Sequence, residues 1–510
     1  MWSTITIVNK EFLMKNLLQS LSRKGISIKL VGEKLQFFGD VSTLTESERQ
    51  EIVENKANIV EFLKQHSGLT GITKRDQKLP NFASFSQGRL WFLDKLNGSS
   101  AEYNIPLYLK VEGQVNVIAV EQSLNKILER HQVLRTTYHE VDGEILQKIT
   151  SIDELSFKVI NIDLSHLSED DLMVALENQI SAETLTPFNL AKDVMLRASY
   201  IKTSKNSGLL LFNMHHIAAD GWSMEILKRE FFAFYKGEIE QKEVALSALE
   251  IQYADYAQWQ RAYLDESKTN AQLSYWRGQL EDAPALHRLP VKGARPQRKN
   301  NEGMRYIQSI DAATASMLMQ VSKQYKLTPF MLMHAMFSLL LSRHSNERDI
   351  IIGTPTANRS SQALESLIGF FVNTLALRVG TEHQTIVDYF EHIREVNVEA
   401  QANQDVPFEQ LVEHLKIPRS LTHTPLFQIM LTTSNDYGVS KGETADASIP
   451  QLSLTNFIPQ KVQAKFDLEL DVHLSVDGGV LTWTYDVSLF DAERIERMSR
   501  HFSNLLTNLC

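Results

Sequence analysis

The stretch Leu209-Leu-Leu-Phe-Asn-Met-His-His-Ile-Ala-Ala-Asp-Gly-Trp-Ser223 decides how the chain is organised. Its apolar start is typical of a buried strand. Apolar residues then recur at helical spacing over Met224–Tyr235, and Ser223 suits the N-cap of that helix. Two imidazoles and a carboxylate therefore lie at a strand–loop–helix junction, where functional groups of α/β folds are commonly placed.

Two interpretations of this junction are open. Because side chains alternate along a strand, His215 and His216 should face opposite sides, one toward a cavity and one into the core. Histidine suits proton transfer near neutral pH, Asp220 can orient a ring or anchor an arginine, and Gly221 lets a backbone N–H approach a substrate. A satisfied core histidine pair with a turn aspartate explains the same letters, so the surrounding sequence has to decide.

Composition excludes several classes of protein. At 510 residues, 43% apolar and 22% charged, the chain is globular and long enough for two to four units. A net charge of −10 and the lack of a basic, aromatic-rich run argue against nucleic-acid binding. Cys510 is the only cysteine, so we expect no disulfide framework, thiolate nucleophile or CxxC metal site. Without a signal peptide or membrane-length apolar run, we expect a cytoplasmic protein that makes no membrane contact.

The usual motifs for ATP, dinucleotides, serine hydrolases and zinc proteases are missing from the sequence.

Residues 1–66 form a small unit that we predict to be α-β-β-α, with helices over 10–24 and 45–63. A two-stranded sheet leaves open edges, which invite a strand from another chain. An extension packed on the main body is the alternative. The candidate docking residues lie on the hairpin: Ile28, Lys29, Leu30, Lys34, Leu35 and Phe37.

Residues 67–80 form a polar linker, after which helices and strands alternate as in an α/β fold. The helix over 117–129 ends at Arg130-His131 before a strand, and the helix that begins at Thr328-Pro329 ends at Arg343-His344 before another. If this likeness is a repeat, the chain is a pseudo-dimer with lobes at 81–255 and 256–510. Only the first lobe carries the histidine pair, so we expect one active site near the cleft between the lobes.

Six ordered motifs then show that residues 80–510 resemble a condensation domain of a nonribosomal peptide synthetase. A seventh is degenerate, because residues 422–424 lack the second arginine usual beside Arg419, and Gln132 stands where glutamate is common. Residues 1–66 resemble a TubC-type N-terminal docking domain by pattern and position. The six motifs are Ser84–Leu93, Arg130–Tyr138, Met214–Ser223, Tyr253–Trp259, Ile368–Thr374 and Asn403–Glu409.

The resemblance implies two lobes like chloramphenicol acetyltransferase in a V, with a tunnel between them. Donor and acceptor carrier proteins deliver thioesters on phosphopantetheine arms, and the acceptor amine attacks the donor thioester. The chain itself would bind no cofactor. The docking domain would add a strand from the C-terminal docking segment of the preceding subunit, and Lys29 and Lys34 suit an acidic tail. An adenylation domain is expected downstream in the full-length protein.

The resemblance places His216 at the reacting centre, as a base or as the residue that holds the amine. An α-amino pKa of about 8 and roughly 7–11 kcal/mol from alignment favour positioning over general base catalysis, which supplies about 10²–10⁴-fold. Asp220 would pair with an arginine, with Arg135 and Arg295 as candidates. The Gly221 N–H could stabilise an oxyanion.

Asn373 and Ser223 are tunnel or supporting residues in this interpretation, with Asn373 lining the tunnel near the site. A strand-end hydrogen bond explains Asn373 equally well. The first motif and the loop before Ser223 resemble those of domains that accept a D-configured donor. The alternatives are an epimerisation domain, which usually has serine before the tryptophan, and a non-catalytic module that docks carriers. A heterocyclisation domain would have an aspartate-rich motif in place of the histidine pair.

Overall fold

The computed structural model describes seven longer parts of the chain and several short stretches before them. The longer parts are residues 72–98, 100–299, 301–359, 361–418, 420–433, 452–457 and 459–509, and the short ones are 27–31, 34–38, 44, 49–50, 52–53, 55–56 and 58–60. The predicted helix over 10–24 and Arg419 lie outside these residues. In the described parts of the chain, no helix is both long and apolar enough to cross a membrane.

The predicted N-terminal hairpin is present. Strands β1 (Ser27–Val31) and β2 (Lys34–Phe38) pair in an antiparallel ladder in which Ile28 lies opposite Phe37. Ile28 is buried and Leu35 half-buried, whereas the side chains of Lys29, Leu30, Lys34 and Phe37 lie outside the described residues. Helical residues follow between 49 and 60, with Ile52 and Ile59 buried, as the prediction for the second helix requires.

The N-lobe is built on a five-stranded sheet with the order β13-β3-β8-β7-β6. Helix α5 packs on α7, and Phe231 of α7 packs edge-on against Phe212 of β8 with ring centroids 4.9 Å apart. The elements up to the lobe boundary are α4 (Phe85–Asn97), β3 (Asn104–Gly113), α5 (Val117–Arg130), β4 (Thr136–Val141), β5 (Glu144–Ile149), β6 (Ile160–Asp163), α6 (Glu169–Leu185), β7 (Leu196–Ser204), β8 (Ser207–His215), α7 (Gly221–Glu240) and α8 (Tyr253–Tyr263).

The C-lobe is built on a seven-stranded sheet with the order β11-β10-β12-β15-β16-β9-β14. Its elements are α9 (Glu266–Gln279), β9 (Glu302–Ile310), α10 (Ala312–Gln324), α11 (Pro329–Ser345), β10 (Asp349–Thr356), α12 (Gln362–Glu365), β11 (Asn373–Gly380), α13 (Ile386–Ala402), α14 (Phe408–His414), β12 (Ile429–Thr433), β13 (Leu452–Asn456), β14 (Lys461–Gln463), β15 (Leu468–Ser475), β16 (Gly478–Asp486) and α15 (Ala492–Leu509). Of these, β13 joins the N-lobe sheet.

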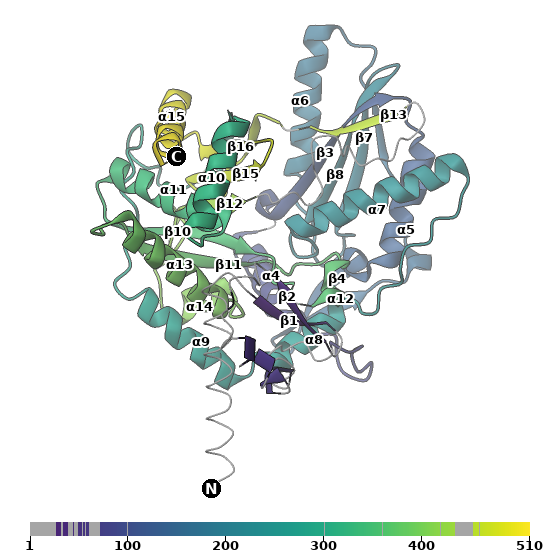
Figure 1. Ribbon diagram of the computed structural model, residues 1–510. Helices are drawn as coiled ribbons and strands as arrows, with labels where there is room; N and C mark the ends of the chain where they lie inside the picture. The colour runs from purple at the N-terminus through teal and green to yellow at the C-terminus, as the bar shows by residue number, and fades with distance from the viewer. Residues whose placement is uncertain are drawn as a thin grey trace.

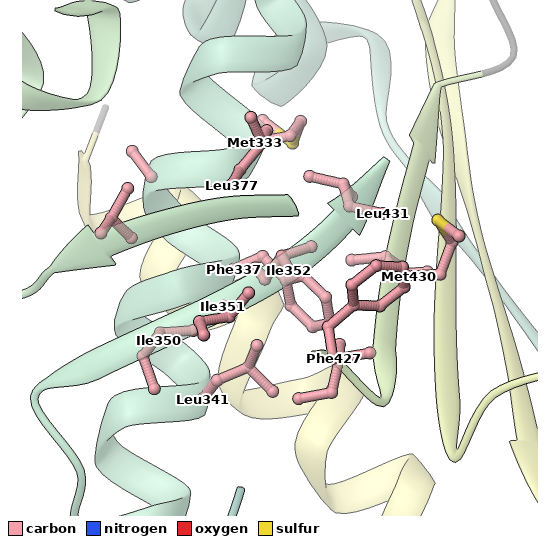
Figure 2. Packing of buried hydrophobic residues seen from close by; sticks show 14 of the residues in the cluster. Met333, Phe337, Leu341, Ile350, Ile351, Ile352, Leu377, Phe427, Met430 and Leu431 are labelled. Carbon is pink, nitrogen blue, oxygen red and sulfur yellow. The ribbon is translucent and has the colours of Figure 1, made fainter. Parts of the chain in front are cut away.

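The C-lobe core lies where α11 covers strands β10 and β12. Figure 2 shows Phe337 of α11 close to Ile352 of β10 and to Phe427. A Cβ at Gly353 would lie 2.1 Å from the Phe427 ring, so only glycine lets the ring approach the strand this closely. Thr328 caps α11 and Pro329 opens it, as predicted from the sequence.

The C-terminal half of the chain enters the N-lobe twice. Strand β13, yellow-green in Figure 1, lies on the blue N-lobe sheet and pairs with β3. The second entry is residues 361–372, here called the crossover segment, whose Leu364, Leu367, Ile368 and Phe371 belong to the N-lobe core. Because of these two entries, no single point in the sequence divides the lobes. The predicted boundary between 255 and 256 falls inside α8.

Helices α8 and α9 are separate, because Asp265 caps the start of α9 two residues after α8 ends. The suggested repeat does not hold strand for strand. The strand after His131 is β4, in a separate two-stranded sheet with β5, whereas the strand after His344 is β10, within the seven-stranded sheet.

Candidate active site at the lobe junction

The histidine motif lies where β8 ends and α7 begins. His215 is the last residue of β8, Gly221 is the first of α7, and Asp220 is the N-cap, accepting a hydrogen bond from the Ser223 N–H at 2.9 Å. The prediction that Ser223 is the N-cap was therefore wrong by three residues. Aspartate and serine both cap well, and Asp220 holds the position because its carboxylate bonds Ser223 from the extended conformation a cap requires.

His215 is a core residue. Its side chain is only 1% exposed and packs between Tyr103 and Phe188, with ring centroids 6.2 and 5.8 Å away. Its Nδ1 accepts a hydrogen bond from the Ile217 N–H at 3.1 Å. Burial, with the nearby positive charges of Lys465 and Arg197, lowers the pKa of His215 to about 3. His215 therefore stays neutral near pH 7, and its buried ring supports the loop through Ile217.

His216 has the opposite character. It is half-buried, and its Nδ1 lies 3.0 Å from the Ala219 carbonyl oxygen, which can only accept, so Nδ1 carries the proton. Its Nε2 has no hydrogen-bond partner among the described residues. Burial lowers the pKa of His216 well below its ordinary value, and the charges of Lys465 and His215 act in the same direction. The neutral ring thus presents an unpaired Nε2 acceptor.

Asp220 pairs with Arg359, and neither Arg135 nor Arg295 is its partner. Arg359 Nη2 lies 3.1 Å from Asp220 Oδ1, and the two side chains are 1% and 2% exposed. Arg135 donates to the carbonyls of Leu128 and Thr150. The prediction of Arg135 or Arg295 as the partner of Asp220 was wrong because an ion pair between residues so far apart in sequence leaves no local pattern.

Arg295 is engaged elsewhere, in an ion pair with Asp467. Arg359 also donates to the carbonyls of Leu364 and Leu367, and its guanidinium lies 4.2 Å from the Phe371 ring centroid. A single buried cation therefore joins the histidine loop to the crossover segment. Removing either partner of such a pair leaves an uncompensated buried charge.

The other carboxylate oxygen and Ser223 fix the backbone of the crossover segment. Asp220 Oδ2 accepts from the N–H groups of Phe371 and Val372 at 3.0 and 3.2 Å. Ser223 Oγ accepts from the Gly369 N–H at 3.0 Å and lies 2.9 Å from the Gly369 carbonyl. Ser223 is fully buried, so its supporting role is to hold this segment.

Gly221 and Asn373 lie at the starts of α7 and β11. A Cβ on Gly221 would meet nothing within 4 Å, and the residue is exposed at the first position of α7, so no tight bend requires glycine there. Asn373 is buried, donates to the carbonyls of Gln404 and Val406, and accepts from Thr374 and Phe408 N–H groups. Its amide is thus occupied at the end of β11, which is the strand-end alternative.

A half-buried charged cluster from both halves of the chain lies near the histidines. Burial lowers the pKa of Lys465, while Glu469 and Glu102 oppose that shift. Burial also raises the pKa of Glu469, which Lys465 and Lys299 counteract. Lys465 is the charge that acts on both His215 and His216. Among the described residues, no group of three or more histidine, cysteine, aspartate or glutamate side chains could hold a metal ion.

Known proteins share this architecture. The family model of the Condensation domain matches residues 81–510. The chain belongs to the condensation-domain family. The model of the TubC N-terminal docking domain matches residues 14–65, so a docking domain precedes the condensation domain. Condensation domains are acyltransferases that form amide bonds, and the two-lobed fold predicted from the sequence is confirmed.

The relatives of this condensation domain are peptide synthetases of much greater length. One of the linear gramicidin synthase proteins from Brevibacillus parabrevis is 35% identical over 514 residues, covering 100% of this chain but 6% of that protein. Malpinin synthetase from Mortierella alpina is 38% identical over 440 residues, covering 86% and 6%. A holo four-domain nonribosomal peptide synthetase bound to AMP and glycine shares the fold at 24% identity, with a TM-score of 0.73 over 84% of this chain and 33% of that one.

Sequence reasoning missed three residues that contact the candidate site of this condensation domain or the crossover segment beside it. Arg359 pairs with Asp220, and the Phe370 ring lies 5.1 Å from the His216 ring. His131 accepts a hydrogen bond from the Ile368 N–H. His131 and Phe370 lie within matched motifs and Arg359 lies outside them, but a residue's place in a motif does not say which distant group it meets.

Proposed function

We propose that this chain forms the peptide bond between two carrier-bound substrates, with His216 at the reacting centre. The observation that carries the proposal is the Nε2 of His216, which is unpaired among the described residues while Nδ1 is fixed to Ala219. A neutral imidazole with this tautomer accepts a hydrogen bond from an attacking amine. The carrier-bound thioester is attacked at its carbonyl carbon, and the thiol of the donor phosphopantetheine arm leaves.

Positioning contributes more than proton removal in this proposal. The acceptor α-amine has a pKa of about 8, so part of it is neutral at pH 7 without help. A hydrogen bond to Nε2 aligns the nitrogen lone pair with the thioester, and alignment can supply roughly 7–11 kcal/mol. His216 then accepts the proton as the tetrahedral intermediate forms. General base catalysis of this kind typically raises the rate by about 10²–10⁴-fold.

The developing oxyanion needs a donor on the other side of the carbonyl. Gly221 supplies the first N–H of α7, a position whose N–H has no partner within the helix. The helix dipole also favours negative charge at this end. We therefore assign the oxyanion contact to the Gly221 N–H, supported by the open space around its Cα.

Partners follow from the family and the N-terminal unit. Donor and acceptor carrier proteins would bring phosphopantetheine arms to the site, and the β1–β2 hairpin would bind the C-terminal docking segment of an upstream subunit. A donor with a D-configured residue fits the sequence of the first and third motifs. An adenylation domain downstream would load the acceptor carrier.

Product analysis tests the proposal. Donor and acceptor carriers, each loaded with one aminoacyl group, are mixed with this chain, and the acceptor carrier is analysed by intact mass spectrometry. We expect a dipeptidyl thioester on the acceptor, formed faster from a D-donor than from its L-enantiomer. Absence of the dipeptide with both donors would contradict the proposal, and inversion of a donor residue without condensation would establish the epimerisation alternative.

Docking needs its own measurement. Deleting residues 1–66 should weaken recruitment of a carrier that bears the upstream docking segment, while excised carriers at high concentration still react. Equal affinity with and without these residues would contradict the docking role.

A further inference from the structure

The five residues 368–372 of the crossover segment, here called the ledge, are held residue by residue by N-lobe side chains. His131 Nδ1 accepts from the Ile368 N–H at 3.3 Å, and Ser223 Oγ accepts from the Gly369 N–H at 3.0 Å. The Tyr253 hydroxyl donates to the Phe370 carbonyl at 2.6 Å. Asp220 Oδ2 accepts from the N–H groups of Phe371 and Val372. Such a ladder of side-chain bonds leaves the ledge little freedom to shift.

Close packing restricts the ledge further. A Cβ at Gly369 would lie 2.2 Å from the Tyr253 ring and 2.5 Å from the Phe371 ring. Phe371 is 2% exposed and packs against Tyr253 and Tyr256, with centroids 5.0 and 4.7 Å away. The ledge is thus fastened by its backbone and by the side chain of Phe371.

The neighbouring Phe370 lies at the edge of the N-lobe core. It is half-buried, and its ring meets the His216 ring at 5.1 Å between centroids and 63° between planes. The hydrogen bond from Nδ1 to Ala219 restrains one corner of the imidazole, and Phe370 lies against the ring itself. Edge-to-face contacts of this kind have a preferred geometry, so the pair defines the plane in which Nε2 lies.

We propose that Phe370 is a positioning residue for condensation, which sets the plane of the His216 imidazole and keeps water from it. The inference rests on the proposed function for its effect on rate, because Phe370 acts through His216. The fixed ledge explains why a residue from the C-terminal half of the chain can orient a histidine of the N-lobe.

Loss of the ring has a defined electrostatic consequence. Burial is the main cause of the low pKa of His216, and the charges of Lys465 and His215 add to it, with Glu102 and Glu469 facing Lys465. Water that enters where Phe370 stood relieves the burial and leaves those charges in place. The pKa of His216 then rises toward its ordinary value of 6.5.

The test compares Phe370→Ala, Phe370→Tyr and Phe371→Leu with the wild-type chain. The readouts are the thermal midpoint, the single-turnover rate at saturating acceptor carrier, and the titration of the His216 Cε1–H resonance in ¹³C-histidine-labelled protein, assigned with His216→Gln. Phe370→Ala should keep the midpoint, lower the rate by about 10–100-fold without changing the acceptor concentration for half-maximal rate, and raise the titration midpoint. Phe370→Tyr should restore both readouts.

Phe371→Leu is the matched structural control, and it should lower the thermal midpoint because it removes a buried ring. An unchanged His216 titration in Phe370→Ala overturns the inference, as does a loss of rate that accompanies an equal loss of folded protein. The titration is recorded without carriers. If Phe370→Ala shifts it while His216→Ala condenses at the wild-type rate, the proposed function fails and the contact stands.

Discussion

The two places where the C-terminal half enters the N-lobe are held by different kinds of bonds. Strand β13 extends the N-lobe sheet through a backbone ladder with β3, and near it Lys461 pairs with Glu177 at the surface. The crossover segment is held by buried side chains, among them the Asp220–Arg359 pair. A backbone ladder tolerates many side chains, whereas buried polar contacts tolerate few. We therefore expect the contact between the lobes at β13 to tolerate many side-chain substitutions, and the contact beside His216 to tolerate few.

Loss of the buried ion pair should have the largest effect on stability. Arg359→Ala leaves Asp220 buried without its charge partner, which typically costs about 3–5 kcal/mol. Urea unfolding followed by fluorescence measures the change. The matched control is Arg348→Ala, whose partner Glu382 and own side chain are 59% and 76% exposed, and which should cost about 0–1 kcal/mol. Equal losses in both variants would contradict the distinction between the two kinds of contact.

Gly369→Ala should have the next largest effect. The added methyl would overlap the Tyr253 ring, and overpacking of this kind typically costs about 1–3 kcal/mol. Gly88→Ala is the control, because its Cβ meets nothing within 4 Å inside α4 and it should be neutral or stabilise by up to about 1 kcal/mol. Both values come from the same unfolding experiment. A neutral Gly369→Ala would show that the ledge can move.

Acid should weaken the crossover segment through His131. Its Nδ1 accepts from Ile368, and burial lowers its pKa although the contact with Glu230 opposes this. The unfolded chain therefore binds a proton below about pH 6.5 that the folded chain does not, and stability falls with pH there by up to about 1.4 kcal/mol per unit. In His131→Gln, the dependence of unfolding free energy on pH between 6.5 and 5 should be shallower. An identical slope would exclude His131 from this linkage.

Changes beside β13 should have the smallest effects. Lys461 and Glu177 are 78% and 60% exposed, so Lys461→Ala should cost about 0–1 kcal/mol, and less in high salt. Thr455 lies within β13, where its backbone pairs with Lys110. Thr455→Val keeps that backbone and should change stability by less than about 0.5 kcal/mol. A loss above about 2 kcal/mol in either variant would mean that β13 is as specific as the crossover segment.

Local patterns predicted the elements of this fold well. The helices after Asn116 and Thr328 each have a cap that a few neighbouring residues encode. The strand before His215 and the N-terminal hairpin each have an apolar pattern that is equally local. The motif order then predicted the two lobes, because it matches a whole family and not a single stretch.

Contacts between distant residues could not be predicted in the same way. Arg359 lies 139 residues from Asp220, and the sequence offered several arginines of equal standing. The cap at Asp220 was misplaced because Ser223 is as good a capping residue, and only the extended backbone at Asp220 separates them. Whether a Cβ at Gly221 would meet another group could not be predicted either, and the structure shows nothing within 4 Å of it.

The most direct test of His216 as the reacting centre is the single-turnover rate of amide formation from preloaded carriers. His216→Ala should lower that rate by at least about 10²-fold, with the thermal midpoint close to that of the wild-type chain. His215→Gln is the comparison, because it replaces the buried ring of the adjacent residue. It should act mainly by lowering the thermal midpoint. Equal rates for the wild-type chain and His216→Ala would contradict the account.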